Sequence, residues 1–462
     1  MISCPRILIA GTNSGVGKTS VTLALVGALR QRGLRVQTFK VGPDYLDPTY
    51  LARASGRPCY NLDGWMMGRD YVRELFARQA ASADISVIEG VMGLFDGSDP
   101  MSIEGSTAQI AAWLQAPVVL VVNVHGLARS IAPLVKGFAE FDPTVAIRGV
   151  IANKCGTERH QIHLTRSLAA GDLPQLVAAI PRDAFPALPS RHLGLVTADH
   201  RNLSDDIIQQ LGRVIDTPGT IETMIRLADQ APELEAGTAP PEISPLPSPV
   251  RLGLADDAAF HFYYQDNLDA LEAAGCELVR FSPLHDAALP EGLAGLYLGG
   301  GYPEEYAAEL AANQTMLQAV RDFAGSGRPI YAECGGLMYL SQGITLRDGR
   351  RPELTGLFPS GTRMLDRLKA LGYVEVTLTQ DSLLGRAGDR LRGHEFHYSE
   401  LDDPTAEVAG WEQVYVTRKP SSDTTGREGW QQGRVLASYV HLHFASRPEA
   451  VRHFVAGLAA AT

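Results

Sequence analysis

Short apolar runs alternate with segments of helical spacing along the first half of the chain. After the first run, at residues 7–10, apolar residues recur at helical spacing from Lys18 onward, at Val21, Leu25 and Leu29. Four further runs have the length and composition of strands, at residues 35–40, 85–88, 117–124 and 148–153. Strand–helix units at this spacing predict an α/β fold with a doubly wound parallel sheet, whose ligands bind at the carboxyl ends of the strands.

The same alternation resumes in the second half after a break. Strands are expected at residues 250–255, 277–281, 296–298 and 329–331, and a helix at 268–274. The break, residues 232–249, holds six prolines in eighteen residues and follows neither period. Because proline fixes φ and lacks an N–H donor, this segment is expected to be an extended linker. The sequence therefore predicts two α/β domains, at residues 1–231 and 250–462.

The loop between the first strand and its helix has the features of a phosphate-binding loop. Its glycines let backbone N–H groups approach phosphate oxygens, Lys18 can reach the β- and γ-phosphates, and the Thr19 hydroxyl can bind Mg²⁺. Thr12 stands where the strict P-loop pattern has glycine, so a turn that binds nothing is the alternative. We expect a nucleoside triphosphate to contact Gly11, Thr12, Asn13, Ser14, Gly15, Val16, Gly17, Lys18 and Thr19.

Carboxylates follow two of the predicted strands at their carboxyl ends. Asp44 and Asp47 come after the second strand, and Glu89 and Asp96 come after the third. Acidic side chains clustered near a bound triphosphate suggest Mg²⁺ ligation and orientation of a substrate. Loop acids that only face solvent are the alternative. The expected Mg²⁺ ligands are Thr19, Asp47 and Glu89.

The second half contains a cysteine in a context typical of a nucleophile. Cys334 lies between a short strand and an apolar helix and is followed by Gly335. Such a turn exposes the thiol above helix N–H groups, which lower its pKa and stabilise an oxyanion. Gly300 and Gly301, at the end of another strand, are further candidate oxyanion donors.

Two histidines near the C-terminus are candidate bases for this cysteine. Residues 438–444 alternate as a strand, so His441 and His443 are expected on one face, and either could activate Cys334. Two alternatives stand beside this reading: Cys334 is only a buried apolar residue, or the histidines bind a metal together with His394 and His397.

Composition narrows the class of protein. The chain has 462 residues and a net charge of −11, which argues against nucleic acid as a partner and requires local basic groups to hold an anionic substrate. It shows no membrane-spanning run and no signal peptide, so no membrane association is expected. Five widely spaced cysteines favour reduced thiols in the cytoplasm.

Five motifs together resemble a known family. GTNSGVGKT, KVGPDYLDPTYL, EGVMGLFDG, ECGGLMYL and SYVHLHF, in this order, are similar to those of the cobyrinic acid a,c-diamide synthases, over nearly the whole chain. The resemblance implies a dethiobiotin-synthetase-like ATP domain joined to a class I glutamine amidotransferase domain.

In that family, Cys334 would attack glutamine with His441 as base, and ammonia would pass to the other domain. There ATP and Mg²⁺ would activate carboxylates of a corrinoid, a tetrapyrrole polycarboxylate. Asp44, Asp47, Glu89 and Asp96 match the family's ATP, metal and substrate positions, and Leu46 matches a position of the substrate loop.

Two departures and several alternatives remain. Most class I glutaminases have His-x-Glu, whereas position 443 here is histidine, so the group that orients His441 is not identified. Asn13 replaces the lysine of partition ATPases, which argues against a switch ATPase. The substrate could be cobyrinic acid, hydrogenobyrinic acid or nickel sirohydrochlorin. Two other functions are possible: a cobyric acid synthase, or a regulatory P-loop ATPase with an inactive glutaminase-like module. The sequence leaves open whether the protein forms a homodimer.

Overall fold

In the computed structural model the chain divides into two compact units, Met1–Ala239 and Pro240–Thr462. The structure describes residues 2–186, 190–191, 194–195, 203–238, 245–246, 248–403, 410–420 and 424–461. The division lies inside the segment predicted to be a linker, of which residues 239–244 and 247 lie outside the described residues. Residues 232–238 pack on the first unit, where Leu234 pairs with Ile2 and Pro232 accepts a hydrogen bond from Arg6.

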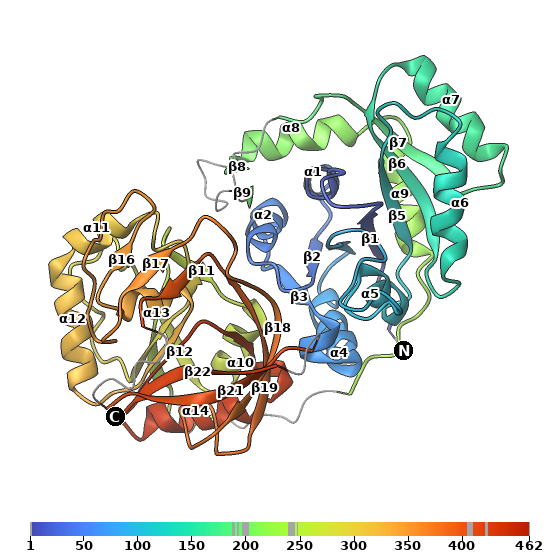
Figure 1. Ribbon diagram of the computed structural model, residues 1–462. Helices are drawn as coiled ribbons and strands as arrows, with labels where there is room; N and C mark the ends of the chain where they lie inside the picture. The colour runs from blue at the N-terminus through green and yellow to red at the C-terminus, as the bar shows by residue number, and fades with distance from the viewer. Residues whose placement is uncertain are drawn as a thin grey trace. The chain divides into compact units, whose positions relative to one another are not determined.

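The first unit is built on a parallel sheet, as predicted (Figure 1). The predicted strands are present within one or two residues, and two short or edge strands, β3 and β7, are added. In spatial order the strands are β3 (Tyr60–Leu62), β2 (Val36–Val41), β4 (Ile85–Glu89), β1 (Arg6–Gly11), β5 (Val118–Asn123), β6 (Ile147–Cys155) and β7 (Gln175–Pro181).

Helices cover both faces of this sheet. One hydrophobic cluster joins β1 to α1, α2, α8 and α9, while on the other side Phe76 of α4 contacts Phe39 of β2, with ring centroids 4.8 Å apart. The helices are α1 (Lys18–Gln31), α2 (Leu46–Ser55), α3 (Gly64–Met67), α4 (Arg69–Ala80), α5 (Thr107–Trp113), α6 (Ile131–Phe141), α7 (Glu158–Ala169), α8 (Asp205–Ile215) and α9 (Thr220–Asp229). A short pair, β8 (Ser190–Arg191) and β9 (Gly194–Leu195), precedes α8.

The second unit is built on a mixed sheet. Its first strands in spatial order pair in parallel, and the strands from β22 onward pair antiparallel. The spatial order is β12 (Cys276–Phe281), β10 (Val250–Ala255), β13 (Gly295–Leu298), β15 (Ile330–Glu333), β23 (Val435–Ser438), β22 (Thr425–Gln432), β21 (Glu412–Arg418), β18 (Ala370–Leu378), β19 (Arg390–His397) and β24 (His441–His443).

Smaller elements complete the second unit. β11 (Phe260–Phe262) pairs with β14 (Gly300–Gly301), and β16 (Ile344–Thr345), β17 (Thr362–Met364) and β20 (Ser399–Leu401) form another small sheet. The helices are α10 (Gln265–Ala273), α11 (Ala307–Ala312), α12 (Gln314–Gly325), α13 (Gly335–Leu340), α14 (Glu449–Ala459) and the 3₁₀ turn η1 (Phe444–Ser446).

The continuous strand predicted at residues 438–444 is wrong. β23 ends at Ser438 and pairs with β15 and β22, whereas β24 starts at His441 and pairs with β19. In between, the N–H of Tyr439 donates to Glu428 and the N–H of Val440 donates to the Ser438 hydroxyl. Side-chain oxygens thus replace strand partners, which an alternating pattern cannot reveal.

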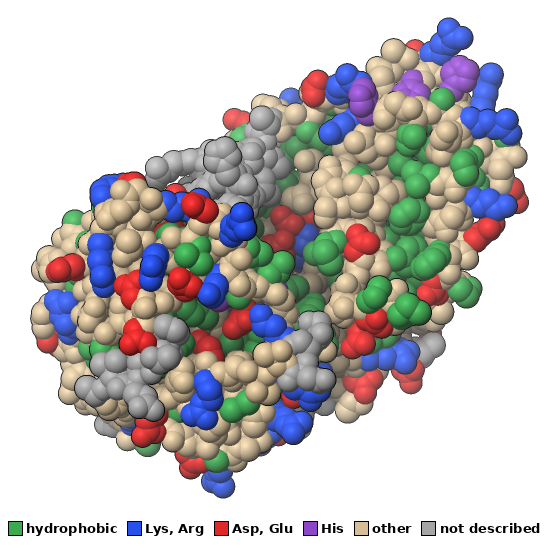
Figure 2. All heavy atoms as spheres, in the orientation of Figure 1, with side chains coloured by type: hydrophobic (Ala, Val, Ile, Leu, Met, Phe, Trp, Pro, Cys, Tyr) green, Lys and Arg blue, Asp and Glu red, His purple; other side chains and the backbone are tan. Residues whose placement is uncertain are grey.

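The surface carries both signs of charge. On the face shown in Figure 2, basic and acidic side chains are interspersed. In the described part of the chain, none of the helices has the length and apolar character needed to cross a membrane. All five cysteines are free and buried.

Candidate active site

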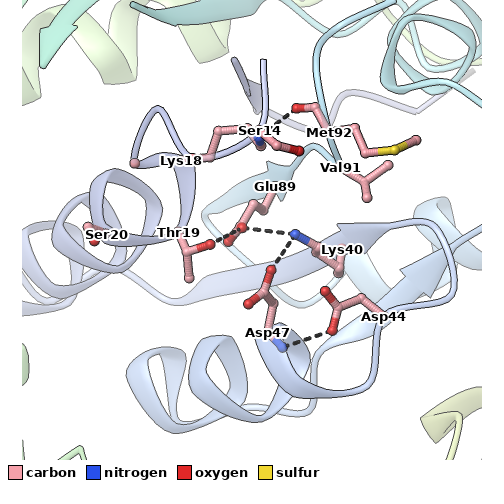
Figure 3. A pocket seen from close by; sticks show the side chains of 12 residues that line it. Ser14, Lys18, Thr19, Ser20, Lys40, Asp44, Asp47, Glu89, Val91 and Met92 are labelled. Carbon is pink, nitrogen blue, oxygen red and sulfur yellow. Dashed lines mark hydrogen bonds and ion pairs between the residues drawn. The ribbon is translucent and has the colours of Figure 1, made fainter. Parts of the chain in front are cut away.

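A pocket of about 350 Å³ opens at the carboxyl end of the parallel sheet, where the predicted loop and carboxylates meet (Figure 3). Its floor and walls come from the loop before α1, the ends of β2 and β4, and the start of α2. The lining residues are Ser14, Gly15, Gly17, Lys18, Thr19, Ser20, Lys40, Asp44, Asp47, Glu89, Val91 and Met92.

The other predicted residues of this site lie beside the pocket rather than in its lining. Val16 is buried in the core, and the Gly11 carbonyl accepts a hydrogen bond from Leu94. Asp96 Oδ2 accepts from the Gly93 N–H at 2.8 Å, so it shapes the loop after β4. Leu46 begins α2, with its N–H on Asp44 Oδ1. Thr12 and Asn13 are hydrogen-bonded to each other through their side chains.

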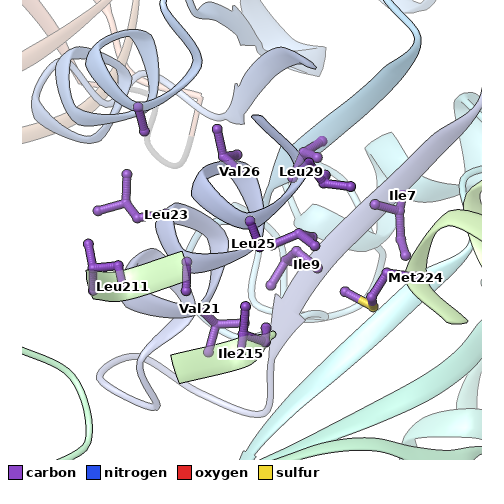
Figure 4. Packing of buried hydrophobic residues seen from close by; sticks show 14 of the residues in the cluster. Ile7, Ile9, Val21, Leu23, Leu25, Val26, Leu29, Leu211, Ile215 and Met224 are labelled. Atoms are coloured by element: carbon purple, nitrogen blue, oxygen red, sulfur yellow. The ribbon is translucent and has the colours of Figure 1, made fainter. Parts of the chain in front are cut away.

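Packing fixes the two elements that flank the loop. In Figure 4, Ile7 and Ile9 of β1 lie against Leu25 and Leu29 of α1, and all four are fully buried. Because β1 and α1 are held by this cluster, the loop between them has little freedom. This is the apolar spacing that predicted the strand and the helix.

Glycine is required in the loop at position 17. Gly17 has φ 97°, a left-handed conformation, and a Cβ there would lie 2.3 Å from Asn153 Nδ2. That amide donates to the Val16 carbonyl at 2.7 Å and so holds the loop to β6. Gly15 also has a positive φ, 77°, but a Cβ there would meet nothing within 4 Å. The constraint at 17 is therefore both conformational and steric.

Lys40, which the sequence analysis did not select, links the carboxylates. Its Nζ lies 2.6 Å from Asp47 Oδ2 and 2.9 Å from Glu89 Oε1. Burial alone would lower the pKa of Lys40, but the charges of Asp47 and Glu89 outweigh it and raise the pKa above its ordinary value. The one available signal was a lysine at the end of an otherwise buried strand.

The carboxylates outnumber the cation that pairs with them. Burial raises the pKa of Glu89 to about 7, although Lys40 opposes this rise. Burial and the charge of Asp47 raise the pKa of Asp44 to about 6. Burial alone would raise the pKa of Asp47 as well, but the charge of Lys40 and its hydrogen bond outweigh burial and lower the pKa below its ordinary value. A further positive charge in this pocket would relieve the repulsion between these groups.

The geometry fits a bound Mg²⁺. Thr19 Oγ1 donates to Glu89 Oε1 at 2.7 Å, while the buried Glu89 Oε2 has no hydrogen-bond partner among the described residues. Two carboxylates and a hydroxyl suit Mg²⁺, which keeps several waters and needs few protein ligands.

The alternative of a metal held by the histidines of the second unit finds no support in the structure. Within the described ranges, no group of three or more His, Cys, Asp or Glu side chains is arranged to hold a metal ion, including at His394 and His397.

Lys18 is held by backbone carbonyls. Its Nζ donates to the Met92 carbonyl at 2.5 Å and to the Asn13 carbonyl at 3.4 Å. Met92 has φ 49°, rare for a residue with a side chain, and is 42% exposed. Burial and the nearby Lys40 lower the pKa of Lys18. The ammonium thus lies at the pocket, bound to groups that a phosphate oxygen could replace.

The second unit presents Cys334 on a strained turn between β15 and α13. The residue has φ 47° and ψ −98°, its N–H donates to the Ser438 carbonyl at 2.7 Å, and it is 5% exposed. Burial would lower the pKa of His441, but its interactions with the Cys334 thiol and with Glu333 raise it to about 10.

The three candidate oxyanion glycines lie in crowded positions, and Gly300 lies against His441. A Cβ at Gly300 would be 2.4 Å from His441 Cε1, and one at Gly335 would be 3.1 Å from the Gly301 nitrogen. Gly301 has φ 155°, and a Cβ there would be 2.0 Å from the Ala259 carbonyl oxygen. A side chain at any of these three positions would therefore require its neighbours to move, and at Gly300 that neighbour is His441.

His443 is placed differently from His441. Its ring packs on Tyr264, with centroids 4.8 Å apart, and Nδ1 accepts from the Ala445 N–H at 3.2 Å. Burial lowers the pKa of His443 to about 3, so it stays neutral. Of the two candidate bases, the structure brings His441 to Cys334.

A buried carboxylate that the sequence analysis missed faces the other side of His441. Glu333 Oε2 lies 3.5 Å from His441 Nδ1. Glu333 directly precedes Cys334, so its position beside the candidate nucleophile could be seen in the sequence. Its contact with His441 could not, because the two residues are 108 positions apart.

Comparison with known proteins agrees with this division of the chain. Residues 7–196 match the family described as "CobQ/CobB/MinD/ParA nucleotide binding domain", and residues 251–449 match the "CobB/CobQ-like glutamine amidotransferase domain". Among solved structures, PurLQS from Thermotoga maritima shares 14% identity with a TM-score of 0.34, covering 45% of this chain and 98% of that chain, which is a slight likeness.

Curated relatives span the whole chain. A cobyrinate a,c-diamide synthase of Syntrophotalea carbinolica is 57% identical over 98% of both chains. Enzymes of the same name from Leptospira interrogans and Salmonella typhimurium are 44% and 43% identical, over 98% and 97% of both chains respectively.

Fold and sites thus define a nucleotide-binding protein with a glutamine amidotransferase domain. More narrowly, the chain belongs to the cobyrinate a,c-diamide synthase family.

Proposed function

We propose that the protein is an ATP- and glutamine-dependent ligase that amidates the a and c carboxylates of cobyrinic or hydrogenobyrinic acid in cobalamin biosynthesis. The observation that supports this proposal is that one chain carries both the pocket lined by Lys18 and Lys40 and a cysteine, Cys334, on a strained turn beside His441. The relatives that bear this name match the chain over nearly its full length. A regulatory ATPase with an inactive module would have no use for a thiol on a strained turn beside a histidine.

The second unit would release ammonia from glutamine. The Cys334 thiolate attacks the carboxamide carbon, and the His441 imidazolium gives its proton to the departing nitrogen. Ammonia leaves and a thioester remains, which water hydrolyses to glutamate and free thiol. The backbone N–H groups of Gly300, Gly301 and Gly335 are proposed to stabilise the oxyanion that forms in this step.

The first unit would activate the carboxylate. A substrate carboxylate oxygen attacks the γ-phosphorus of ATP, ADP leaves, and an acyl phosphate forms. Ammonia then attacks the acyl carbon and phosphate leaves, so each amide consumes one ATP and one glutamine. Lys18 would hold the phosphates, and Thr19, Asp47 and Glu89 would hold Mg²⁺, which supplies charge neutralisation on the phosphates. Asp44, Asp96 and Leu46 are proposed to orient the substrate.

Mass spectrometry of a substrate panel tests the proposal. Cobyrinic acid, hydrogenobyrinic acid and nickel sirohydrochlorin are each incubated with protein, ATP, Mg²⁺ and glutamine. A diamide of one of the first two supports the proposal and identifies the metal state of the substrate. A diamide of nickel sirohydrochlorin alone moves the protein to another pathway, and no amide with ATP still hydrolysed favours the regulatory ATPase. Lys18→Ala is the control that should form no amide from glutamine or from ammonia.

A further inference from the structure

We propose that Glu333 is the positioning residue of the glutaminase site: its carboxylate orients His441 and stabilises the imidazolium that forms beside Cys334. This inference rests on the proposed glutamine hydrolysis. Glu333 would take the role of the glutamate that most class I glutaminases have two residues after the histidine, a position that is His443 here. The carboxylate comes from the end of β15 instead of from the residue two places after the base.

The Glu333 carboxylate is fixed from several sides. Tyr297 donates to Oε2 at 2.9 Å, and Tyr331 donates to Oε1 at 2.5 Å. The Leu442 N–H also donates to Oε1, at 3.0 Å. Glu333 is 2% exposed, so these bonds and the His441 contact are made away from water. The carboxylate therefore has little freedom to turn away from the imidazole.

All three groups that hydrogen-bond to the Glu333 carboxylate are donors: two phenols and one backbone amide. Both phenols keep their protons, because burial and the charge of Glu333 raise the pKa of Tyr297 and of Tyr331 well above the ordinary value. A fixed negative charge in a dry site is the group that an imidazolium needs as its neighbour.

The position of the carboxylate selects the ring nitrogen. Because Oε2 faces Nδ1, a proton is favoured on Nδ1, and Nε2 is left for exchange with the Cys334 thiol. The backbone supports this arrangement: Leu442, which bonds Glu333, directly follows His441 in β24. One short strand thus carries the base and a donor that holds the carboxylate facing it.

Other titratable groups near His441 do not offer the same charge. His394 lies opposite His441 in the β19–β24 pairing, and burial lowers its pKa to about 3. Burial likewise lowers the pKa of His397 to about 4, so both are neutral. Glu395 follows His394, but burial raises its pKa and its carboxylate lies 3.6 Å from Lys419. Glu333 is the carboxylate that contacts the ring of His441 among the described residues.

Glu333→Gln tests the role, because it keeps the shape and removes the charge. Glutamine hydrolysis should fall on the order of 10²-fold or more in kcat with a smaller change in KM, as for the orienting carboxylate of other triads. Ammonia-dependent amidation should remain. Without the charge, the thiolate–imidazolium pair is less favoured, so the acidic limb of the pH profile should move to higher pH. Glu333→Asp keeps the charge and should leave that limb nearer its original place.

A direct readout is the alkylation of Cys334 by iodoacetamide, followed by peptide mass spectrometry so that the other four cysteines are scored separately. At a given pH the rate should be lower in Glu333→Gln than in the wild type, and its rise with pH should be displaced to higher pH. Tyr297→Phe, which removes one donor to Oε2, should produce a smaller shift in the same direction. Glu412→Gln, the same change at an exposed position of β21, should leave the pH dependence unshifted.

The outcomes separate the two hypotheses. Wild-type protein that releases no glutamate from glutamine contradicts the proposed function itself. If the wild type hydrolyses glutamine and Glu333→Gln keeps its kcat and pH profile, the positioning role is wrong. A loss of kcat with an unmoved acidic limb and unchanged alkylation would assign Glu333 a structural role only, and would also overturn the inference.

Discussion

Lys40 Nζ lies 2.9 Å from Glu89 Oε1 in an ion pair that is almost completely removed from solvent, with side-chain exposures of 3% and 0%. Asp47 completes the pair on the other side of the ammonium, 2.6 Å away. Since Asp47 and Glu89 are the proposed Mg²⁺ ligands, Lys40 holds them together before a metal binds. Lys40 therefore contributes both to the folding stability of the first unit and to the placement of the proposed Mg²⁺ ligands.

Lys40→Met should therefore destabilise the first unit. Removing one partner of a buried ion pair leaves uncompensated charge, and we expect a loss of roughly 3 kcal/mol, at the low end of the range because Glu89 can take up a proton. Urea unfolding measures the loss, and added Mg²⁺ should recover part of it. Arg35→Met, which breaks an exposed pair with Asp84, is the control and should change stability little. Equal midpoints for both variants would contradict this account.

Alanine at two glycines of the phosphate-binding loop should have unequal effects. A Cβ at Gly15 meets no neighbour, so Gly15→Ala should destabilise the loop conformation only by the strain of a positive φ, about 1–2 kcal/mol. Gly17→Ala adds a clash with Asn153 and should abolish ATP binding. Nucleotide titration calorimetry on both variants checks this order. Similar affinities in the two variants would show that Asn153 can move aside.

Gly300→Ala should separate the two nitrogen sources. Its Cβ would lie 2.4 Å from His441 Cε1, so the imidazole must shift from Cys334. We expect glutamine-driven amidation to fall at least about 10²-fold, since small displacements of catalytic groups have effects of this size. Ammonia-driven amidation should be unchanged, and its loss would mean that the substitution disturbs more than the glutaminase site.

The sequence predicted the parts of this protein that depend on local pattern. β1, the phosphate-binding loop and α1 follow from apolar spacing and glycines within 25 residues, and the turn at Cys334 follows from its flanking strand and glycines. The carboxylates after β2 and β4 were predicted together because parallel strands end at one edge of a sheet.

Lys40 and Glu333 were missed because their roles depend on distant partners. Lys40 pairs with a residue 49 positions away, and Glu333 faces a histidine 108 positions away. Nothing in their own neighbourhoods distinguishes them from ordinary residues at strand ends. The break between β23 and β24 was missed for a related reason, because it depends on Glu428 from another strand.

The pH dependence of stability in the second unit should reflect Glu428. Burial raises its pKa to about 8, above the ordinary value of 4.5, so between these values the folded state holds a proton that the unfolded state has lost. Stability from this group is therefore full below about 4.5 and falls as pH rises through about 8, by up to about 1.4 kcal/mol per pH unit.

Comparison with Glu428→Gln isolates this contribution. The variant cannot titrate there, so its urea midpoint should gain on that of the wild type as pH rises from 5 to 8. Effects of pH on other groups are common to both proteins and cancel. A constant difference across this range would show that Glu428 does not titrate as its burial implies.

The most direct test of the two-site account follows the nitrogen itself. Wild type and Cys334→Ser are given ATP, Mg²⁺ and corrinoid with [amide-¹⁵N]glutamine, or with unlabelled ammonium instead, and the product is weighed by mass spectrometry. The account predicts ¹⁵N-diamide from the wild type, none from Cys334→Ser with glutamine, and unlabelled diamide from both proteins with ammonium. Labelled diamide from Cys334→Ser, or no amide from that variant with ammonium, would contradict it.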